Sequence, residues 1–262
     1  MIDIEKAKEQ YKKHVEKINT SDSRNQRKIG HMYRVANVSK QIAQKMNLPE
    51  EQTKLAELIG LLHDIGRFEQ YKVFDKNTAS VTMDINKIFD HGQAGVDVLK
   101  KDNYIRKFIQ DDKYDEIIYK AIFEHNKFQI SNELTKEEEL FCKLIRDADK
   151  IDIMYESVDI FWQKDEEIKR LENDELSEKI VEDFYNKKLI NSENCRKYSI
   201  DSLLKIVAFI YDINFQESFE ILKENDYINQ IINRFDFKKT DTKEEMLKIK
   251  NIANKYIIEK SF

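Results

Sequence analysis

Four histidines and two aspartates stand at intervals along the first part of this 262-residue chain, each at or near the apolar face of an expected helix. They are His31, His63, Asp64, His91, His125 and Asp149. Imidazole nitrogens and carboxylate oxygens are the donors that hold borderline divalent metals in proteins. An ionisable group that turns toward a core is costly unless something compensates its charge. The six residues together therefore indicate a metalloenzyme.

Helical spacing predicts that these side chains turn inward. His31 shares a face with Val35 and the following apolar residues at intervals of three or four, and His63 closes a stripe of leucines and isoleucine. Asp64 is the next residue, so it can reach the same ion from the end of the helix. In the last of these helices the spacing favours Asp149 over Asp147, which falls on the far side. The fifth histidine, His14, lies among charged residues and is expected to be solvated.

The elements that must position these residues are helices. One proline and five glycines in 262 residues leave little material for the turns of a strand-rich fold. Capping signals and periodicity predict helices over 3–18, 24–46, 49–64, 90–101, 114–127, 136–162, 165–189, 199–212, 214–224, 226–234 and 241–259. Ser21, Asp22 and Ser23 form the cap signal of the second helix, and a loop is expected from Gly66 to residue 84.

Two parts of different character are expected, residues 1–155 and residues 156–262. All five glycines lie within the first 95 residues, and each is within four residues of a candidate ligand. Glycine weakens a helix, so Gly60 and Gly95 inside helical runs indicate close approach of backbone near the ligands. The second part is rich in tyrosine, phenylalanine and isoleucine and lacks a ligand cluster, which predicts a helical extension that packs on the core as a cap or forms an oligomer interface.

Composition narrows the classes of function. Charged residues make up 36% of the chain and the net charge is −5, which disfavours a nucleic-acid polymer as partner. Two cysteines, Cys142 and Cys195, are too few and too far apart for a disulfide framework, and Cys142 is expected to be a buried thiol. With no membrane-spanning stretch and no signal-peptide pattern at Met1, a cytoplasmic protein is expected.

Three local strings resemble the HD-domain superfamily of metal-dependent phosphohydrolases. His31-Met32-Tyr33-Arg34-Val35-Ala36 is similar to the family's first-helix motif, and Leu61-Leu62-His63-Asp64-Ile65-Gly66-Arg67 is similar to its HDIG signature. Ala148-Asp149-Lys150-Ile151-Asp152 is similar to its closing motif. The resemblance covers roughly residues 24–155, and His91 and His125 match the branch that holds two metals. Asn126 stands where HD-GYP domains have a second histidine, and the Gly-Tyr-Pro string is missing.

The resemblance implies an all-α fold, an HD helical bundle with a C-terminal helical extension. It also implies two divalent transition-metal ions, of Fe, Mn, Co, Ni or Zn. His31, His63, Asp64 and Asp149 would hold the first ion, and Asp64 would bridge to a second held by His91 and His125. Such a pair of ions activates a hydroxide for attack on a phosphoester. Asp64 and Arg67 are thus the expected catalytic residues.

Positive charge on the non-attacked phosphoryl oxygens is a further requirement. Arg67 is the best candidate substrate contact, and Lys150 and Arg34 are alternatives, each equally compatible with a structural or solvent-facing role. Glu69, Asp90 and Glu124 are candidates for carboxylates that orient the ligand histidines.

The leading hypothesis is a phosphohydrolase acting on a nucleotide or other small phosphorylated compound, as a monoesterase or a diesterase. A di-iron oxygenase of the same superfamily, acting on a small organic substrate, uses the same ligand set and is the alternative. A non-catalytic nucleotide-binding regulator is a third hypothesis, which the intact ligand set disfavours. A homodimer is compatible with the chain, and no membrane partner is expected.

Overall fold

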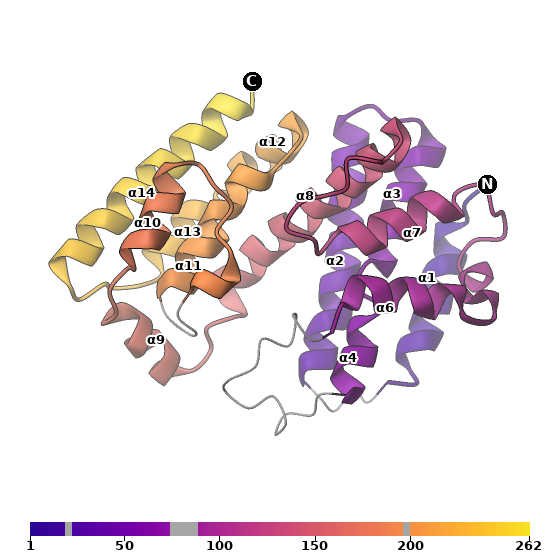
Figure 1. The fold of residues 1–262 in the computed structure, drawn as a ribbon, viewed down its shortest axis with the longest axis horizontal. Helices are drawn as coiled ribbons and strands as arrows, with labels where there is room; N and C mark the ends of the chain where they lie inside the picture. Colours follow the sequence, from indigo (N-terminus) through magenta and orange to yellow (C-terminus); the bar gives the residue numbers. More distant parts are fainter. Residues whose placement is uncertain (19–22, 74–88, 196–199) are drawn as a thin grey trace. The chain divides into compact units, whose positions relative to one another are not determined.

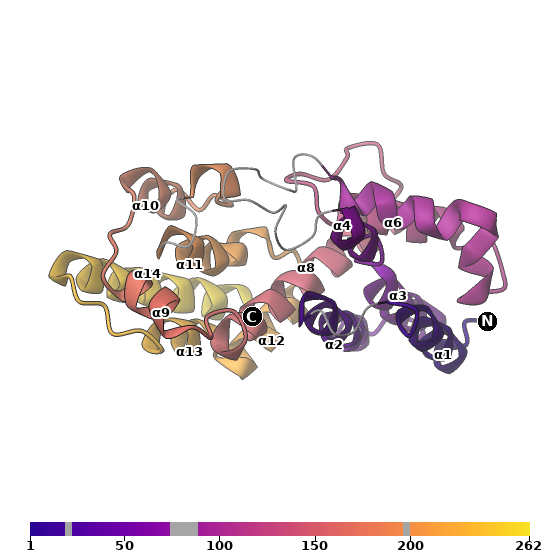
Figure 2. The same cartoon turned by 90° about the horizontal axis from the view of Figure 1, so that it is seen from below.

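The computed structural model describes all residues except 19–22, 74–88 and 196–199. Within the described residues all regular secondary structure is helical, which confirms the expected all-α class (Figures 1 and 2). Two compact units divide it, Met1–Asp149 and Lys150–Phe262, here called the N-terminal and C-terminal units. No helix in the described parts is long and apolar enough to cross a bilayer.

The N-terminal unit contains all six candidate ligands. Its helices are α1 (Ile4–Val15), α2 (Ser23–Lys45), α3 (Glu50–Leu62), α4 (Arg67–Val73), α6 (His91–Lys100), α7 (Asp115–Glu124) and most of α8 (Lys136–Asp159), with a 3₁₀ segment over Lys101–Lys107. α3 is central, because it packs against α1, α2 and α7, and α6 packs against both α4 and α7 (Figure 1). All residues of α3 from Leu55 to Leu62 are buried.

Close packing of α2 on α3 depends on Gly60. A Cβ at this position would lie 2.7 Å from the Cα of Ala36 and 2.9 Å from its backbone nitrogen. Only glycine therefore lets the two backbones approach so closely. This contact places His31 of α2 beside the end of α3, where His63 and Asp64 follow. The sequence-based prediction of a close backbone approach at Gly60 is thus confirmed.

Two of the predicted elements differ from the structure. The expected loop after Gly66 instead begins with α4, and its remainder from residue 74 to 84 lies outside the described residues, as do Ser21 and Asp22. The single helix expected over 165–189 is two helices, α9 (Asp165–Glu172) and α10 (Glu178–Tyr185). α9 ends at Glu172, and the side chain of the next residue, Asn173, donates a hydrogen bond back to the carbonyl of Lys169.

The C-terminal unit continues with α11 (Ile200–Val207), α12 (Gln216–Asn225), α13 (Tyr227–Asn233) and α14 (Thr240–Lys260), and with 3₁₀ segments over Ser192–Asn194 and Ala208–Asp212. α14 packs against α12 and α13, and α10 packs against α11. Tyr211 and Tyr256 lie 5.1 Å apart between ring centroids, with Phe184 and Phe219 against them, so aromatic rings fill much of this core. The expected boundary between residues 155 and 156 falls inside α8, as does the observed division after Asp149.

Candidate metal centre

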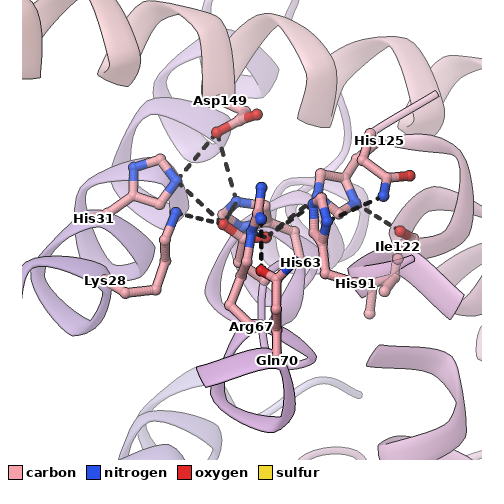
Figure 3. A network of polar contacts seen from close by, with 12 residues as sticks. Lys28, His31, His63, Arg67, Gln70, His91, Ile122, His125 and Asp149 are labelled. Atoms are coloured by element: carbon pink, nitrogen blue, oxygen red, sulfur yellow. Dashed lines mark hydrogen bonds and ion pairs between the residues drawn. The ribbon is translucent and has the colours of Figure 1, made fainter. Parts of the chain in front are cut away.

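Five segments of the N-terminal unit bring the six predicted ligands to one place (Figure 3). His31 comes from the middle of α2, and His63 and Asp64 follow the last turn of α3. His91 is the first residue of α6, His125 directly follows α7, and Asp149 lies on α8. All four rings are buried, and each lies about edge-on to a neighbour at 5.0–5.2 Å between centroids.

Asp64 lies at the centre of the cluster, and its two oxygens face different pairs of histidines. Oδ2 is 3.7 Å from Nε2 of His31 and 3.5 Å from Nε2 of His63. Oδ1 is 3.5 Å from Nε2 of His91 and 3.4 Å from Nε2 of His125. Two groups of three donors that could each hold an ion therefore share this carboxylate.

Asp149 joins only the first of these groups. Its Oδ1 lies 3.1 Å from Nε2 of His31 and 3.6 Å from Nε2 of His63. Asp147, which the helical phase placed on the far side of α8, is fully buried, whereas the Asp149 side chain is 18% exposed, so burial does not identify the ligand. The contacts to the two rings do.

Two rings are oriented by backbone carbonyls. Nδ1 of His63 bonds to the carbonyl of Gly60 at 2.8 Å, and Nδ1 of His125 bonds to that of Ile122 at 2.6 Å. A carbonyl only accepts, so Nδ1 carries the proton and the Nε2 lone pair faces the cluster. Both residues end a helix, where the carbonyl three residues earlier lacks its helical partner.

The three carboxylates proposed as orienting groups make other contacts. Asp90 caps α6 by accepting from the backbone nitrogens of Gly92 and Gln93, and it bonds to Asn126 and Lys127. The Lys127 and Asn126 contacts outweigh its burial and lower the pKa of Asp90 to about 2.

Glu124, the second of these carboxylates, accepts from the backbone nitrogen of Ser131, and Glu69 lines a separate surface hollow with Asp97 and Tyr104. His14, expected to be solvated, is partly buried with its Nδ1 3.0 Å from the hydroxyl of Tyr104.

Burial and neighbouring charges set the protonation of the cluster. Burial lowers the pKa of His63, and burial together with the charge of Arg67 lowers the pKa of His91 well below its usual value. Burial alone would raise the pKa of Asp64, but the nearby Lys28 and Arg67 hold it well below its ordinary range. Neutral imidazoles around an ionised carboxylate are the form that binds a metal.

Lys28 is a buried cation that the sequence reasoning missed. Its Nζ lies 2.6 Å from Oδ2 of Asp64, and its side chain is 11% exposed (Figure 3). The available signal was its position three residues before His31, on the same face of α2. Arg67 flanks the other oxygen, with Nε 3.5 Å from Oδ1 of Asp64, and its Nη1 donates to Oε1 of Gln70 at 2.7 Å.

The other two predicted substrate contacts are placed differently. Arg34 is on α2 one turn after His31, with its Nη1 over Gly30. Lys150 pairs with Asp212 at 2.6 Å within the C-terminal unit and is 7% exposed. Lys150 is thus paired with a carboxylate outside the cluster, whereas Lys28 and Arg67 both lie beside Asp64 at its centre.

Gly66 allows the turn after Asp64 to rest on α6. A Cβ there would lie 2.2 Å from the carbonyl oxygen of His91 and 2.4 Å from the backbone nitrogen of Gly95. Side chains other than hydrogen cannot occupy that space, so glycine at this position brings His91 against the His63-Asp64 turn.

The donor set fits divalent metals. Among the described residues, Nε2 of His63 and Oδ1 of Asp64 are buried atoms with no hydrogen-bond partner. Buried polar atoms are nearly always paired, so unpaired donors that converge on one point indicate a place for a cation. Cys142 lies outside the cluster as the expected buried thiol, and burial raises its pKa to about 12.

Comparison with known proteins supports the same assignment. The family model of the HD domain matches residues 29–154. No curated protein and no solved structure matches the chain. The matched segment begins in α2 before His31 and ends in α8 after Asp149, so it spans the whole cluster. Residues 29–154, a little under half of the chain, are therefore an HD domain, as the resemblance of the local strings predicted.

Proposed function

We propose that this HD domain is a metal-dependent phosphohydrolase that cleaves a phosphoester of a nucleotide or another small phosphorylated compound. The observation that carries the proposal is the shared carboxylate of Asp64, whose oxygens face separate pairs of histidines. In this arrangement His31, His63, Asp64 and Asp149 would hold one ion, and Asp64, His91 and His125 would hold a second. Bound divalent ions supply Lewis-acid activation of water and of a phosphoryl oxygen.

The two cations beside Asp64 favour a phosphorylated substrate. Transfer of a phosphoryl group requires donors for its non-attacked oxygens. Arg67 is partly exposed and held by Gln70, so its guanidinium is oriented before a substrate arrives. Lys28 offers a second cation, an ammonium, beside the other oxygen of Asp64. Both would exchange part of their contact with Asp64 for contacts to phosphate.

A screen of phosphomonoesters, phosphodiesters and nucleotides tests the proposal. It uses the full chain reconstituted separately with Mn, Co, Ni, Fe and Zn, and it includes oxygen consumption with the iron-loaded protein. We expect hydrolysis, and in the Asp64→Asn variant a loss of kcat/KM of about a thousandfold, because several kcal/mol of charge stabilisation disappears and each 1.36 kcal/mol or so is a factor of ten.

Asp97→Asn is the matched control, since Asp97 lies exposed on α6 and pairs with Gln93. It should keep full activity. Metal-dependent oxygen consumption without hydrolysis would favour the di-iron oxygenase, and hydrolysis that survives Asp64→Asn would refute the proposed centre.

A further inference from the structure

The four ligand histidines differ in what their second ring nitrogen touches. For His63 and His125 it is a carbonyl oxygen, which only accepts. For His91 it is the side-chain amide of Asn126, whose Nδ2 lies 3.2 Å from Nδ1 of His91. An amide NH₂ donates and has no lone pair to accept with, so Nδ1 of His91 must be the acceptor.

The orientation of the Asn126 amide is fixed by its other neighbours. Its Nδ2 also donates to Oδ1 of Asp90 at 2.9 Å, and that oxygen is held in place by the backbone nitrogens of Gly92 and Gln93. Turning the amide over would bring its oxygen to within hydrogen-bond distance of the Asp90 carboxylate, where two acceptors repel. Oδ1 of Asn126 instead lies buried against Gly92 without a hydrogen-bond partner.

The consequence falls on the face of His91 that points into the cluster. A neutral ring whose Nδ1 accepts carries its proton on Nε2, and this Nε2 is 3.5 Å from Oδ1 of Asp64. In that tautomer Nε2 has no lone pair for an ion. The proton must move to Nδ1 before the ring can ligate, and Nδ1–H would then point at the amide NH₂ of Asn126.

We propose that Asn126 holds metal-free His91 in the Nε2–H tautomer, so that the centre takes its ions unequally, the His91 side weakly and only after the Asn126 amide has moved. Asn126 is thus a positioning residue that acts through His91, and the inference rests on the proposed two-ion centre. Groups that contact the far nitrogen of a ligand histidine typically change metal affinity by about ten- to a hundredfold. We expect the second ion to bind at least about tenfold more weakly than the first.

The test combines two measurements on the full chain. Nitrogen-15 NMR of labelled histidine in the metal-free protein reports which ring nitrogen carries the proton, and His91→Gln assigns the signal. Calorimetric titration with Mn²⁺ measures the two binding steps. In Asn126→Ala the proton of His91 should move to Nδ1, and the second step should tighten about tenfold.

Asn126→Leu removes the donor without placing a second carboxylate beside Asp90, and it should also move the proton, even if the alanine variant folds poorly. Gln93→Ala removes an exposed side-chain amide from α6, the helix that carries His91, and should change neither measurement. The inference would be overturned if the NMR spectrum showed the proton of His91 on Nδ1 in the wild-type protein. It would also be overturned if every variant bound only one equivalent of Mn²⁺, or if the second binding step were unchanged in Asn126→Ala.

These outcomes are separable from the phosphohydrolase proposal. A tautomer shift and a tighter second step in a protein without hydrolytic activity would leave the inference standing and remove the proposed reaction. Hydrolysis by the wild type, with the His91 proton and the second binding step both unchanged in Asn126→Ala, would support the proposed reaction and remove the inference about Asn126.

Discussion

The two units bury charged side chains in different ways. In the C-terminal unit Asp201 is fully buried and accepts from both the backbone nitrogen and the hydroxyl of Ser177. Arg234 of the same unit donates to the carbonyls of Val158 and Trp162. In the N-terminal unit, by contrast, Oδ1 of the buried Asp64 has no hydrogen-bond partner, and neither has Nε2 of the buried His63.

This difference distinguishes buried polar groups that stabilise the fold from buried polar groups that are available to bind a ligand. A buried charge with satisfied partners ties two segments together and has nothing left to offer a ligand. A buried oxygen or nitrogen whose lone pair has no partner lowers the stability of the fold unless a bound ligand compensates for it. Such atoms are found mainly at functional sites. Among the described residues, both groups of three that include Asp64 and could hold an ion lie within the N-terminal unit.

The largest expected effect is on the folding of the N-terminal unit, through Gly66→Ala. The new Cβ would collide with the backbone of His91 and Gly95, which cannot move without displacing α6. We expect a loss of about 3 kcal/mol in the free energy of unfolding, at the upper end for overpacking. Urea unfolding followed by circular dichroism measures it.

Gly30→Ala is the control for this variant. Its Cβ would meet only the flexible end of Arg34 at 3.2 Å, and alanine favours a helix by about 1 kcal/mol over glycine. We therefore expect this variant to be as stable as the wild type or more so. Equal losses in both variants would show that the turn after Asp64 is not packed as tightly as described.

A somewhat smaller effect should follow metal addition, and it should distinguish the units. An ion at a hundred times its Kd stabilises the state that binds it by about 2.7 kcal/mol. Hydrogen exchange of backbone amides should therefore slow in α2, α3 and α7 when Mn²⁺ is added, and reverse when a chelator removes it. Equal slowing in α12 and α14 would contradict a metal centre confined to the N-terminal unit.

That the six predicted ligands come together could be expected from the sequence, and the groups around them could not, for physical reasons. His31, His63 and Asp149 follow from helical phase, which depends only on local spacing. Lys28 was missed because a lysine on a helix is usually solvated, and only its distance from Asp64 shows otherwise. The carbonyl partners of two histidines depend on where helices end, which sequence reasoning places only to within a few residues.

The same limits explain the two misplaced elements. The sequence predicts a loop at α4 because Gly66 comes directly before it, but Gly66 lies in a short turn that packs on α6, and the chain returns to helix at Arg67. The break between α9 and α10 lacks glycine and proline, so periodicity ran through it. There the backbone nitrogen of Ser177 bonds to Asp201, a contact between residues far apart in the chain.

The smallest expected effects are those of pH, and they should have opposite signs in the two units. In the metal-free N-terminal unit burial holds the pKa of His63 and His91 below the ordinary 6.5. The unfolded chain then binds more protons than the folded one below about this pH. Stability from these rings is complete above pH 6.5 and is lost as the pH falls further, and bound metal should move the loss to lower pH.

The C-terminal unit should instead lose stability in alkali, through Tyr185. Burial and the hydrogen bond to Glu245 raise its pKa from 10.0 to about 12, so the folded state keeps a proton that the unfolded chain releases. Its contribution is complete below pH 10 and is lost as the pH rises toward 12. The ring is 42% exposed, so the effect is small. Urea unfolding of wild type and Tyr185→Phe, followed by the fluorescence of Trp162, measures it. The phenylalanine variant should show a flatter alkaline limb and an unchanged acid limb, and a change confined to the acid limb would contradict the assignment.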